Sequence, residues 1–278
     1  MSQCVIYRDD VMKALGVVES GTVDLIVADP PFNLGKKYSQ KKNNDKKKRD
    51  EYVAWCKAWL TECHRVLKPT GSLFLMNIQN NVWFLQAHLE ELGMVFRNTI
   101  IWKNSSMPVK NRFCVSYQPI LYYAKTEKFV FNFGVEKRDS DAALPWGRTN
   151  KAGSIRDYWD DIPFISGGCM AAKEAILVDP PKNKKKVHPC QMPVKLTERM
   201  ILYTTGKGDT VLDPFMGVGA TAVACLKHDR LFVGIELEPR YVECSKKRLI
   251  EFECEQEVSK RQKRIIEVRE PHDRGVKE

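Results

Sequence analysis

The chain has 278 residues, of which 43% are hydrophobic and 29% are charged, as in an ordinary globular protein. No apolar run reaches membrane-spanning length, and the N-terminus lacks the apolar core of a signal peptide, so we expect a cytoplasmic protein. The formal net charge of +10 indicates a polyanionic partner such as nucleic acid. The nine cysteines have no zinc-type spacing, which predicts no metal site.

The first hundred residues alternate between strand and helix patterns. Residues 22–28, TVDLIVA, form a β-branched apolar run, which is typical of a strand buried on both faces. In the predicted helices, large apolar residues recur at helical spacing. Such alternation predicts a parallel-rich sheet covered by helices. The predicted strands are 22–28, 72–78 and 95–103, and the predicted helices are 51–67 and 81–93.

The middle of the chain has a different character. Residues 117–133 read as two strands around a turn, which predicts a local antiparallel pair. Residues 134–187 have little periodicity and many turn formers, which indicates a loop-rich insertion. Alternation then resumes, and the residues from Ser259 onward are highly charged with few large apolar residues, so we expect a solvated helical extension or a frayed tail. The later predicted elements are helices at 192–205, 219–228 and 239–257 and strands at 209–215 and 230–237.

A glycine loop joins the strand 209–215 to the next helix. Gly217 and Gly219 allow the backbone to approach a ligand, and the helix N-terminus offers unsatisfied N–H groups. Glu236 ends the following strand, where its carboxylate can accept hydrogen bonds from ribose hydroxyls. Neither a P-loop lysine nor the third glycine of the dinucleotide fingerprint is present. The loop therefore predicts a nucleoside cofactor without a pyrophosphate, and a tight turn without a ligand is the alternative.

The strand 22–28 ends in Asp29-Pro30-Pro31-Phe32. Proline fixes φ and biases its predecessor toward an extended backbone, so Asp29 and Phe32 stand on a preset scaffold at the carboxyl edge, where open α/β sheets bind ligands. Asp29 and the Pro30 carbonyl can present two acceptors to one NH2 group, while Phe32 offers a face to a planar ring. These features suit the exocyclic amine of a nucleobase, whose developing charge the acceptors would stabilise. A simple strand-ending turn is the alternative, and we assign that role to the repeat at 179–181, which lacks the aromatic residue.

With both motifs in this order, the chain resembles the β-type DNA amino-methyltransferases that use S-adenosylmethionine. The resemblance covers about 5–257. It implies an α/β fold: a Rossmann-like methyltransferase sheet with helices on both faces and an inserted target-recognition region. The activity it implies is methyl transfer to the N6 amine of a flipped-out adenine in double-stranded DNA. The implied divisions of the chain are a catalytic segment at 1–103, a target-recognition insertion at 104–187, a cofactor-binding segment at 188–257 and a charged tail at 258–278.

The resemblance also implies roles for individual residues. The catalytic residues would be Asp29, Pro30, Pro31 and Phe32. Asp10 would contact the adenine of the cofactor, although Arg8 and Asp9 depart from the family pattern. HPCQMP at 188–193 matches the segment that lines the methionine end, with departures at Cys190 and Met192. DYWDDIPFI at 157–165 resembles a further family stretch, with no chemical role assigned. The cofactor-binding residues would be Asp10, His188, Asp213, Phe215, Gly217, Gly219, Thr221 and Glu236.

Four other functions share some of these sequence features. Cytosine-N4 methylation uses the same chemistry, but that group more often has serine at the position of Asp29. RNA methyltransferases with a related turn often begin it with asparagine. A non-catalytic specificity subunit would be expected to have lost one motif, and both are intact here. Pro189-Cys190 resembles the nucleophile motif of cytosine-C5 methyltransferases, but in that family the glycine loop precedes it.

DNA binding is predicted from basic residues on either side of the site. The segment 35–49 follows the catalytic turn, and we expect it to be mobile without DNA and to close over phosphates. Base reading is expected from 103–187, with Arg156 among the candidates, and the lysines at 182–186 would contact phosphates. The resemblance alone suggests a homodimer, a cognate restriction endonuclease and association with the nucleoid. The predicted DNA-binding residues are Lys36, Lys37, Lys41, Lys42, Lys46, Lys47, Lys48, Arg49, Arg112 and Arg148.

Overall fold

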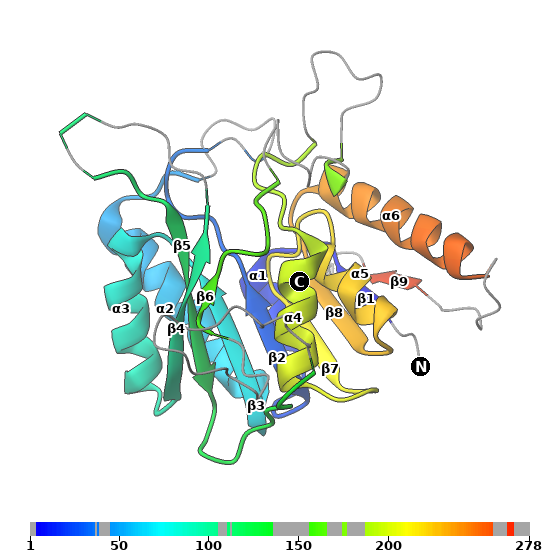
Figure 1. Cartoon of the computed structure of the whole chain (residues 1–278), viewed down its shortest axis with the longest axis horizontal. Helices are drawn as coiled ribbons and strands as arrows, with labels where there is room; N and C mark the ends of the chain where they lie inside the picture. The colour runs from blue at the N-terminus through cyan, green and yellow to red at the C-terminus, as the bar shows by residue number, and fades with distance from the viewer. Residues whose placement is uncertain are drawn as a thin grey trace, which may run out of the picture.

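The computed structural model contains one mixed sheet. Within the described residues the sheet has nine strands in the order β6-β4-β5-β3-β2-β7-β8-β1-β9, and only β5 runs antiparallel to its neighbours (Figure 1). The structure describes residues 4–36, 38, 45–104, 110–111, 113–135, 156–165, 174–176, 187–257 and 266–269. None of the helices in these ranges has the length and apolar character needed to cross a bilayer.

The elements have the following bounds. The strands are β1 (Cys4–Tyr7), β2 (Val23–Ala28), β3 (Leu67–Met76), β4 (Val95–Lys103), β5 (Tyr117–Ala124), β6 (Tyr158–Trp159), β7 (Thr210–Asp213), β8 (Leu231–Ile235) and β9 (Ile266–Arg269). The helices are α1 (Val11–Val17), α2 (Arg49–Val66), α3 (Gln79–Glu91), α4 (Val194–Thr204), α5 (Ala220–Lys227) and α6 (Pro239–Glu257).

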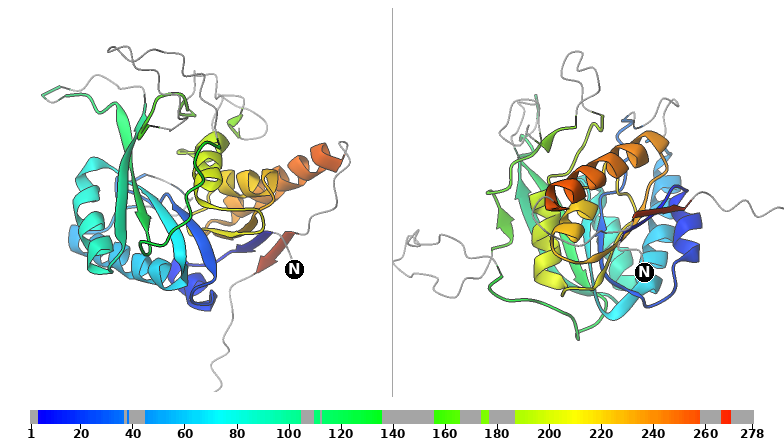
Figure 2. Two further views of the ribbon diagram at one scale, coloured as in Figure 1. Left: turned by 60° about the horizontal axis from the view of Figure 1, so that its bottom comes forward. Right: turned by 90° about the vertical axis from the view of Figure 1, so that its right-hand side faces the viewer.

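Helices cover both faces of the sheet (Figure 2). Apolar residues of α1, α2 and α3 form one core with one face, and those of α4, α5 and α6 form the second core with the other face. The two cores divide the residues of β2 by alternation, because Leu25 and Val27 lie in the α4–α6 core while Ile26 and Ala28 lie in the α1–α3 core. This two-sided burial explains the continuous apolar run that the sequence has here, and it confirms the predicted α/β architecture.

The structure corrects the predicted antiparallel pair at 117–133. Only its first half is a strand, β5, and β5 lies in the main sheet between β3 and β4 instead of forming a local hairpin. Residues 125–133 form no strand. Because antiparallel strands need no crossover helix, the chain can return from β4 to β5 directly. A strand of the central sheet therefore lies inside the range 104–187 that we predicted to be the target-recognition insertion.

The predicted tail also contains a strand. Within the range 258–278, residues Ile266–Arg269 form β9, which pairs in parallel with β1 in the register Cys4–Ile266 to Tyr7–Arg269. β1 would otherwise be an edge strand with unpaired backbone groups. The prediction of a helical or frayed tail is wrong for these four residues, because backbone pairing with β1 places them in the sheet.

The stretch 157–165 anchors the end of the insertion region to the sheet and to α4. β6 pairs with β4, and Trp102 Nε1 donates to the Ile162 carbonyl at 2.7 Å. The Trp102 ring also stacks on Phe164 with centroids 3.6 Å apart. Asp161 accepts two hydrogen bonds from buried Arg199, at 2.9 and 2.6 Å, and this contact holds the pKa of Asp161 below its ordinary value. These contacts give DYWDDIPFI a structural role.

Candidate active site

Four acidic residues meet at the carboxyl edge of the sheet. β1, β8, β7 and β2 are parallel neighbours, and Asp10, Glu236, Asp213 and Asp29 lie at or just after their ends. The Glu236 N–H donates to the Tyr7 carbonyl at 3.0 Å, which ties the ends of β8 and β1 together. Residues more than 200 positions apart in the chain therefore share one edge, which is where open α/β sheets place ligands.

Asp29 follows β2 and is partly exposed. Burial raises the pKa of its carboxyl to about 7, with a further increase from nearby Asp213 and an opposing effect from Lys36. Within the described residues, neither this carboxylate nor the Pro30 carbonyl has a hydrogen-bond donor. Both acceptors that we predicted to bind an amine therefore have no hydrogen-bond partner in this part of the chain, and their binding of an amine stays a prediction.

The carbonyls that follow are occupied by side chains. Tyr52 of α2 donates to the Pro31 carbonyl at 2.8 Å, and Asn81 of α3 donates to the Phe32 carbonyl at 3.1 Å. Asn81 also donates to the side chain of Asn77 at 2.7 Å, and both asparagines are buried. Buried polar networks of this kind rigidify the backbone that they contact. The turn is thus fixed by two helices on one face of the sheet.

Arg49, predicted to bind DNA, belongs to the same network. Its guanidinium donates to the Asn81 side chain at 2.5 Å and to the Asn80 carbonyl at 3.0 Å, and it lies 4.9 Å from the centre of the Phe84 ring. These contacts orient the residue toward the start of α3. The structure therefore gives Arg49 a role in supporting the turn at 29–32 that the sequence analysis did not foresee.

The glycine loop has the backbone that only glycine adopts easily. Gly217 has φ of 52° and Gly219 has φ of 78°, and Gly219 is the N-cap of α5. A Cβ at Gly219 would lie 2.9 Å from Cβ of Ser245 in α6, so a side chain there would also clash. The Gly217 N–H donates to Glu236 at 3.0 Å. The loop is therefore closely packed against both α6 and the predicted ribose-binding acid.

Asp213 and Thr221 stabilise this loop through hydrogen bonds. Asp213 accepts from the Phe215 N–H at 3.0 Å and from the Thr221 hydroxyl at 2.5 Å, and its buried position raises its pKa to about 6. The Phe215 ring packs on Trp59, with centroids 5.0 Å apart, and on Trp55 at 5.7 Å. The contacts of Asp213, Thr221 and Phe215 are with the protein's own loop and core, and their role in cofactor binding stays a prediction.

His188 covers the glycine loop. A Cβ at Gly217 would lie 3.4 Å from His188 Nε2, and the imidazole contacts the Tyr241 ring edge-on, with centroids 4.6 Å apart. The centroid of the Tyr38 ring lies 5.6 Å from that of the imidazole, and the Tyr38 carbonyl accepts from the Tyr241 hydroxyl at 2.5 Å. Burial, with a smaller effect from Lys36, lowers the pKa of His188 to about 4, so its imidazole is neutral at pH 7.

Asp10 and Glu236 already hold backbone groups. Asp10 is the N-cap of α1 and accepts from the Met12 N–H at 2.9 Å. Glu236 accepts from the N–H groups of Gly217 and Glu238, and burial raises its pKa to about 7. An ionised carboxylate has about four lone-pair positions, so both acids retain acceptor capacity for a ligand.

The other predicted DNA-binding residues divide into three groups. Lys36 turns toward the site, where its Nζ contacts Cys190 Sγ at 2.9 Å. Lys46, Lys47 and Lys48 are exposed beside the turn, as a phosphate contact requires. The remaining predicted residues lie outside the described residues, and they are Lys37, Lys41, Lys42, Arg112 and Arg148. The ranges 179–181 and 182–186 also lie outside the described residues.

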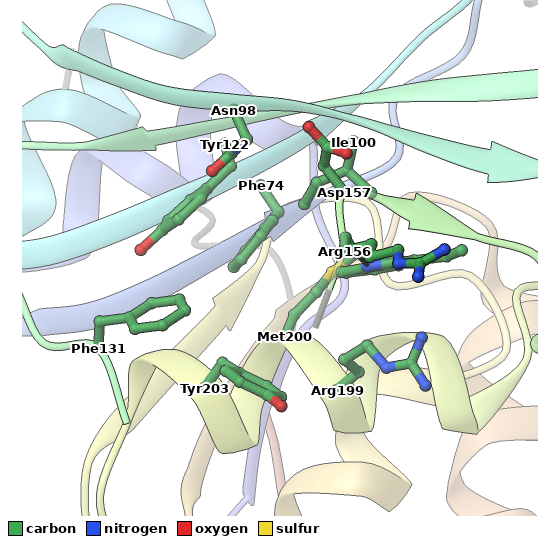
Figure 3. Close-up of a pocket in the computed structure, with 11 residues that line it drawn as sticks. Phe74, Asn98, Ile100, Tyr122, Phe131, Arg156, Asp157, Arg199, Met200 and Tyr203 are labelled. Atoms are coloured by element: carbon green, nitrogen blue, oxygen red, sulfur yellow. Dashed lines mark hydrogen bonds between the residues drawn. The ribbon is translucent and has the colours of Figure 1, made fainter. Parts of the chain in front are cut away.

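A cavity of about 80 Å³ lies away from this edge, between the sheet and α4. Figure 3 shows Phe74, Ile100 and Tyr122 of the sheet on one side and Met200, Tyr203 and Arg199 of α4 on the other. None of the predicted catalytic or cofactor residues lines it. Arg156, a candidate for base reading, contributes to its wall, which places that residue beside the anchored stretch 157–165.

Sequence reasoning missed the residues that support the site. Tyr52, Asn81 and Tyr241 lie within predicted helices, where their hydrogen bonds to distant loops leave no trace in periodicity. Asn77 at the end of β3 had one available signal, because a polar residue directly after a buried strand lies at the ligand-binding edge.

Comparison with known proteins gives consistent matches. A family model described as DNA methylase, of the N6/N4 methyltransferase type, matches residues 23–247. The type II methyltransferase M.HpaI of Haemophilus parainfluenzae is 32% identical over 258 residues, which cover 91% of this chain and 76% of that protein. The DNA adenine methyltransferase YhdJ of Escherichia coli is 31% identical over 254 residues, covering 88% and 82%.

Solved structures match over the same extent. The crystal structure of the M1.HpyAVI–SAM complex has a TM-score of 0.59 and 26% sequence identity, and the match covers 88% of this chain and 98% of that one. This likeness confirms the predicted Rossmann-like methyltransferase sheet with helices on both faces.

Proposed function

The chain belongs to the N6/N4 DNA methylase family, and from this premise we propose that it methylates the N6 amine of adenine in DNA. The observation that carries the proposal is the pair of acceptors at the carboxyl edge. The Asp29 carboxylate and the Pro30 carbonyl have no donor among the described residues, while the next carbonyls are already bonded to Tyr52 and Asn81. This difference supports a role for the first two acceptors in binding the two hydrogens of the target amine.

The chemistry follows from what an amine needs. The lone pair of an exocyclic amine is delocalised into the base, and acceptors on both of its hydrogens favour a more tetrahedral nitrogen. The new bond from nitrogen to the methyl carbon would form as the bond from that carbon to the donor sulfonium breaks, and the donor would leave as a neutral thioether. Positive charge then develops on the nitrogen, and an ionised Asp29 stabilises it. The nitrogen then loses one proton, and Asp29, with a pKa of about 7, can accept it at neutral pH.

The residues at the edge fit S-adenosylmethionine, which supplies the methyl group as an activated sulfonium. Left-handed Gly217 and Gly219 permit close backbone approach, and Asp10 and Glu236 retain acceptor positions for adenine and ribose. Three carboxyls with raised pKa values, Asp29, Asp213 and Glu236, lie at one edge, which favours a cationic ligand there. His188 is neutral at pH 7 and does not oppose that charge.

Adenine is favoured over cytosine on two grounds. YhdJ is named as a DNA adenine methyltransferase, and the turn here opens with aspartate, whereas cytosine-N4 enzymes more often have serine. The base must leave the duplex to reach the turn. Exposed Lys46, Lys47 and Lys48 flank the turn and are suited to DNA phosphates. A homodimer, a cognate endonuclease and a place with the nucleoid in the cytoplasm belong to the same proposal.

The test is a methylation assay with product identification. Purified protein is incubated with unmethylated genomic DNA and methyl-labelled S-adenosylmethionine, and the digested nucleosides are separated by mass spectrometry. We expect labelled N6-methyldeoxyadenosine. Asp29→Ala is expected to reduce the rate by about 10²–10³-fold, the usual effect of removing a group that stabilises developing charge.

Asp24→Asn is the matched control. Asp24 lies on the same strand, but its carboxylate accepts from Lys68 and the Thr210 N–H at the opposite end, so this variant should retain activity. Labelled N4-methyldeoxycytidine would show that the protein methylates the N4 amine of cytosine by the same chemistry. Label in RNA alone, or no label, would contradict the proposed activity.

A further inference from the structure

The four residues after the catalytic motif are held by one acid, Asp45. The N–H groups of Asn33 and Leu34 donate to the Asp45 carboxylate at 2.7 and 3.1 Å, and the Lys36 N–H donates at 3.2 Å. The Gly35 N–H donates to the Asp45 carbonyl at 2.7 Å. Four consecutive backbone donors thus converge on a single residue.

The backbone of the turn explains why an acid is needed. Asn33 and Gly35 both have left-handed φ, 64° and 71°, and alternation of this kind points successive N–H groups into one concavity. Such a concavity binds anions. Only 3% of the surface of Asp45 is exposed, so its carboxylate is the internal anion that fills the concavity. Hydrogen bonds to an ionised acceptor are stronger than neutral ones.

Other hydrogen bonds fix the backbone on both sides of Phe32, and we call the whole set of contacts to 31–36 the frame of the turn. Asn33 also exchanges two hydrogen bonds with the Lys47 backbone, at 3.0 and 2.6 Å. On the preceding side, Tyr52 and Asn81 hold the carbonyls of Pro31 and Phe32. Phe32 lies between these two sets of contacts, and Asp29 lies two residues before the first anchored carbonyl, that of Pro31. Asp45 therefore supplies the anchor on the C-terminal side of the reacting groups.

We propose that Asp45 is a positioning residue for methyl transfer: through the backbone of 33–36 it holds Phe32 and Asp29 in the arrangement that receives the target base. The inference rests on the proposed function. It adds a residue that makes no contact with the base, and it assigns the one acid in the basic segment 35–49 a purpose that phosphate binding does not explain. Loss of the frame should slow the chemical step without weakening the cofactor site.

The test is Asp45→Asn, which keeps the shape of the side chain but replaces one acceptor oxygen with an NH2 group. That group would face backbone donors of the turn, so at least one of their hydrogen bonds is lost. Misplacement of reacting groups by about 1 Å typically costs 10²-fold, and we expect kcat to fall by about that factor. The dissociation constant of S-adenosylmethionine, measured by titration calorimetry, should change less than about threefold.

Asp24→Asn again serves as the control, because it alters a similarly bonded acid at the far end of β2. Its kcat should stay within about twofold of wild type. A loss in Asp45→Asn of cofactor affinity in parallel with kcat would indicate general damage to the fold, and would overturn the positioning role.

Amide hydrogen exchange provides a readout that needs no activity. In Asp45→Asn the amides of 33–36 should exchange at least about tenfold faster than in wild type, and in Asp24→Asn they should not. Unchanged exchange overturns the anchor, and faster exchange with unchanged kcat overturns its role in catalysis. If the wild-type protein transfers no methyl group, the proposed function fails and the positioning role with it, while exchange still decides whether Asp45 holds the turn.

Discussion

At the scale of single residues, the charge of Asp29 should control the rate. Its pKa is raised to about 7, first by burial and then by Asp213, while Lys36 lowers it. Because the ionised carboxylate is the form that accepts from an amine, kcat/KM should rise about tenfold per pH unit below pH 7 and level off above it. The measurement is the initial rate from pH 5.5 to 8.5 with subsaturating DNA and saturating cofactor.

The variant Lys36→Gln tests whether Asp29 is the group whose ionisation produces this pH profile. Removing the cation that lowers the Asp29 pKa should move the rising part of the profile to higher pH. His188, with a pKa of about 4, does not titrate in this range. A rise centred near pH 4, or one that stays in place in Lys36→Gln, would show that another group controls the rate.

The same carboxyl should reduce the stability of the protein at high pH. The folded protein binds a proton at Asp29 more tightly than the unfolded chain does, so stability from this group is complete below about pH 4 and is lost as pH rises through 7. Asp29→Asn removes the free-energy cost of holding an ionised carboxylate at this position. We expect the variant to unfold a few degrees above wild type at pH 8 and at the same temperature near pH 4. Partial exposure of Asp29 reduces the effect, and a variant less stable than wild type at pH 8 would contradict it.

At the scale of elements, the start of α5 depends on Gly219 for two reasons. Alanine there would adopt a left-handed backbone at a cost of about 1–2 kcal/mol and would also crowd Ser245 at 2.9 Å. We expect Gly219→Ala to lower the free energy of unfolding by about 2–4 kcal/mol and cofactor affinity at least tenfold. Denaturant unfolding and calorimetric titration measure the two effects.

Gly93, after α3, is the matched control. It has φ of 76°, like Gly219, but a Cβ there would meet nothing within 4 Å. Gly93→Ala should therefore cost only about 1–2 kcal/mol and leave cofactor binding unchanged. Equal effects of the two substitutions would mean that backbone conformation alone, and not the close approach of α6, makes the loop depend on glycine.

At the scale of the whole molecule, the sequence predicted the helices and strands whose conformation local residue patterns determine. The apolar run 22–28, the helical spacing in 51–67 and the strand 95–103 correspond to β2, α2 and β4, because the conformation of each follows from the pattern of its own residues. The order of motifs also predicted that Asp29, Asp213 and Glu236 would meet at one edge. The place of β5 in the main sheet, the strand β9 and the role of Asp45 were missed, because each depends on a partner distant in sequence: a second strand, an open edge, or a ring of backbone donors.

The closure of the sheet by β9 leads to the last prediction. β9 covers β1, whose residues Cys4 and Ile6 are fully buried, and β1 in turn leads into Asp10 at the cofactor edge. Ending the chain at Glu257 removes the four-residue pairing, and at about 1 kcal/mol per hydrogen bond this costs about 2–4 kcal/mol. The midpoint of thermal unfolding should fall by about 5–10 °C. The exposed edge should also promote aggregation on heating.

A second truncation isolates the strand from the rest of the tail. Ending the chain at Arg269 keeps β9 and removes only 270–278, so its unfolding midpoint should match that of the full chain. Light scattering during the same thermal scans reports aggregation. If both truncations behave alike, the pairing of β9 with β1 contributes no stability, and β1 is able to serve as an edge strand next to the cofactor site. If only the shorter chain is destabilised, four residues in a highly charged tail support the strand that positions Asp10.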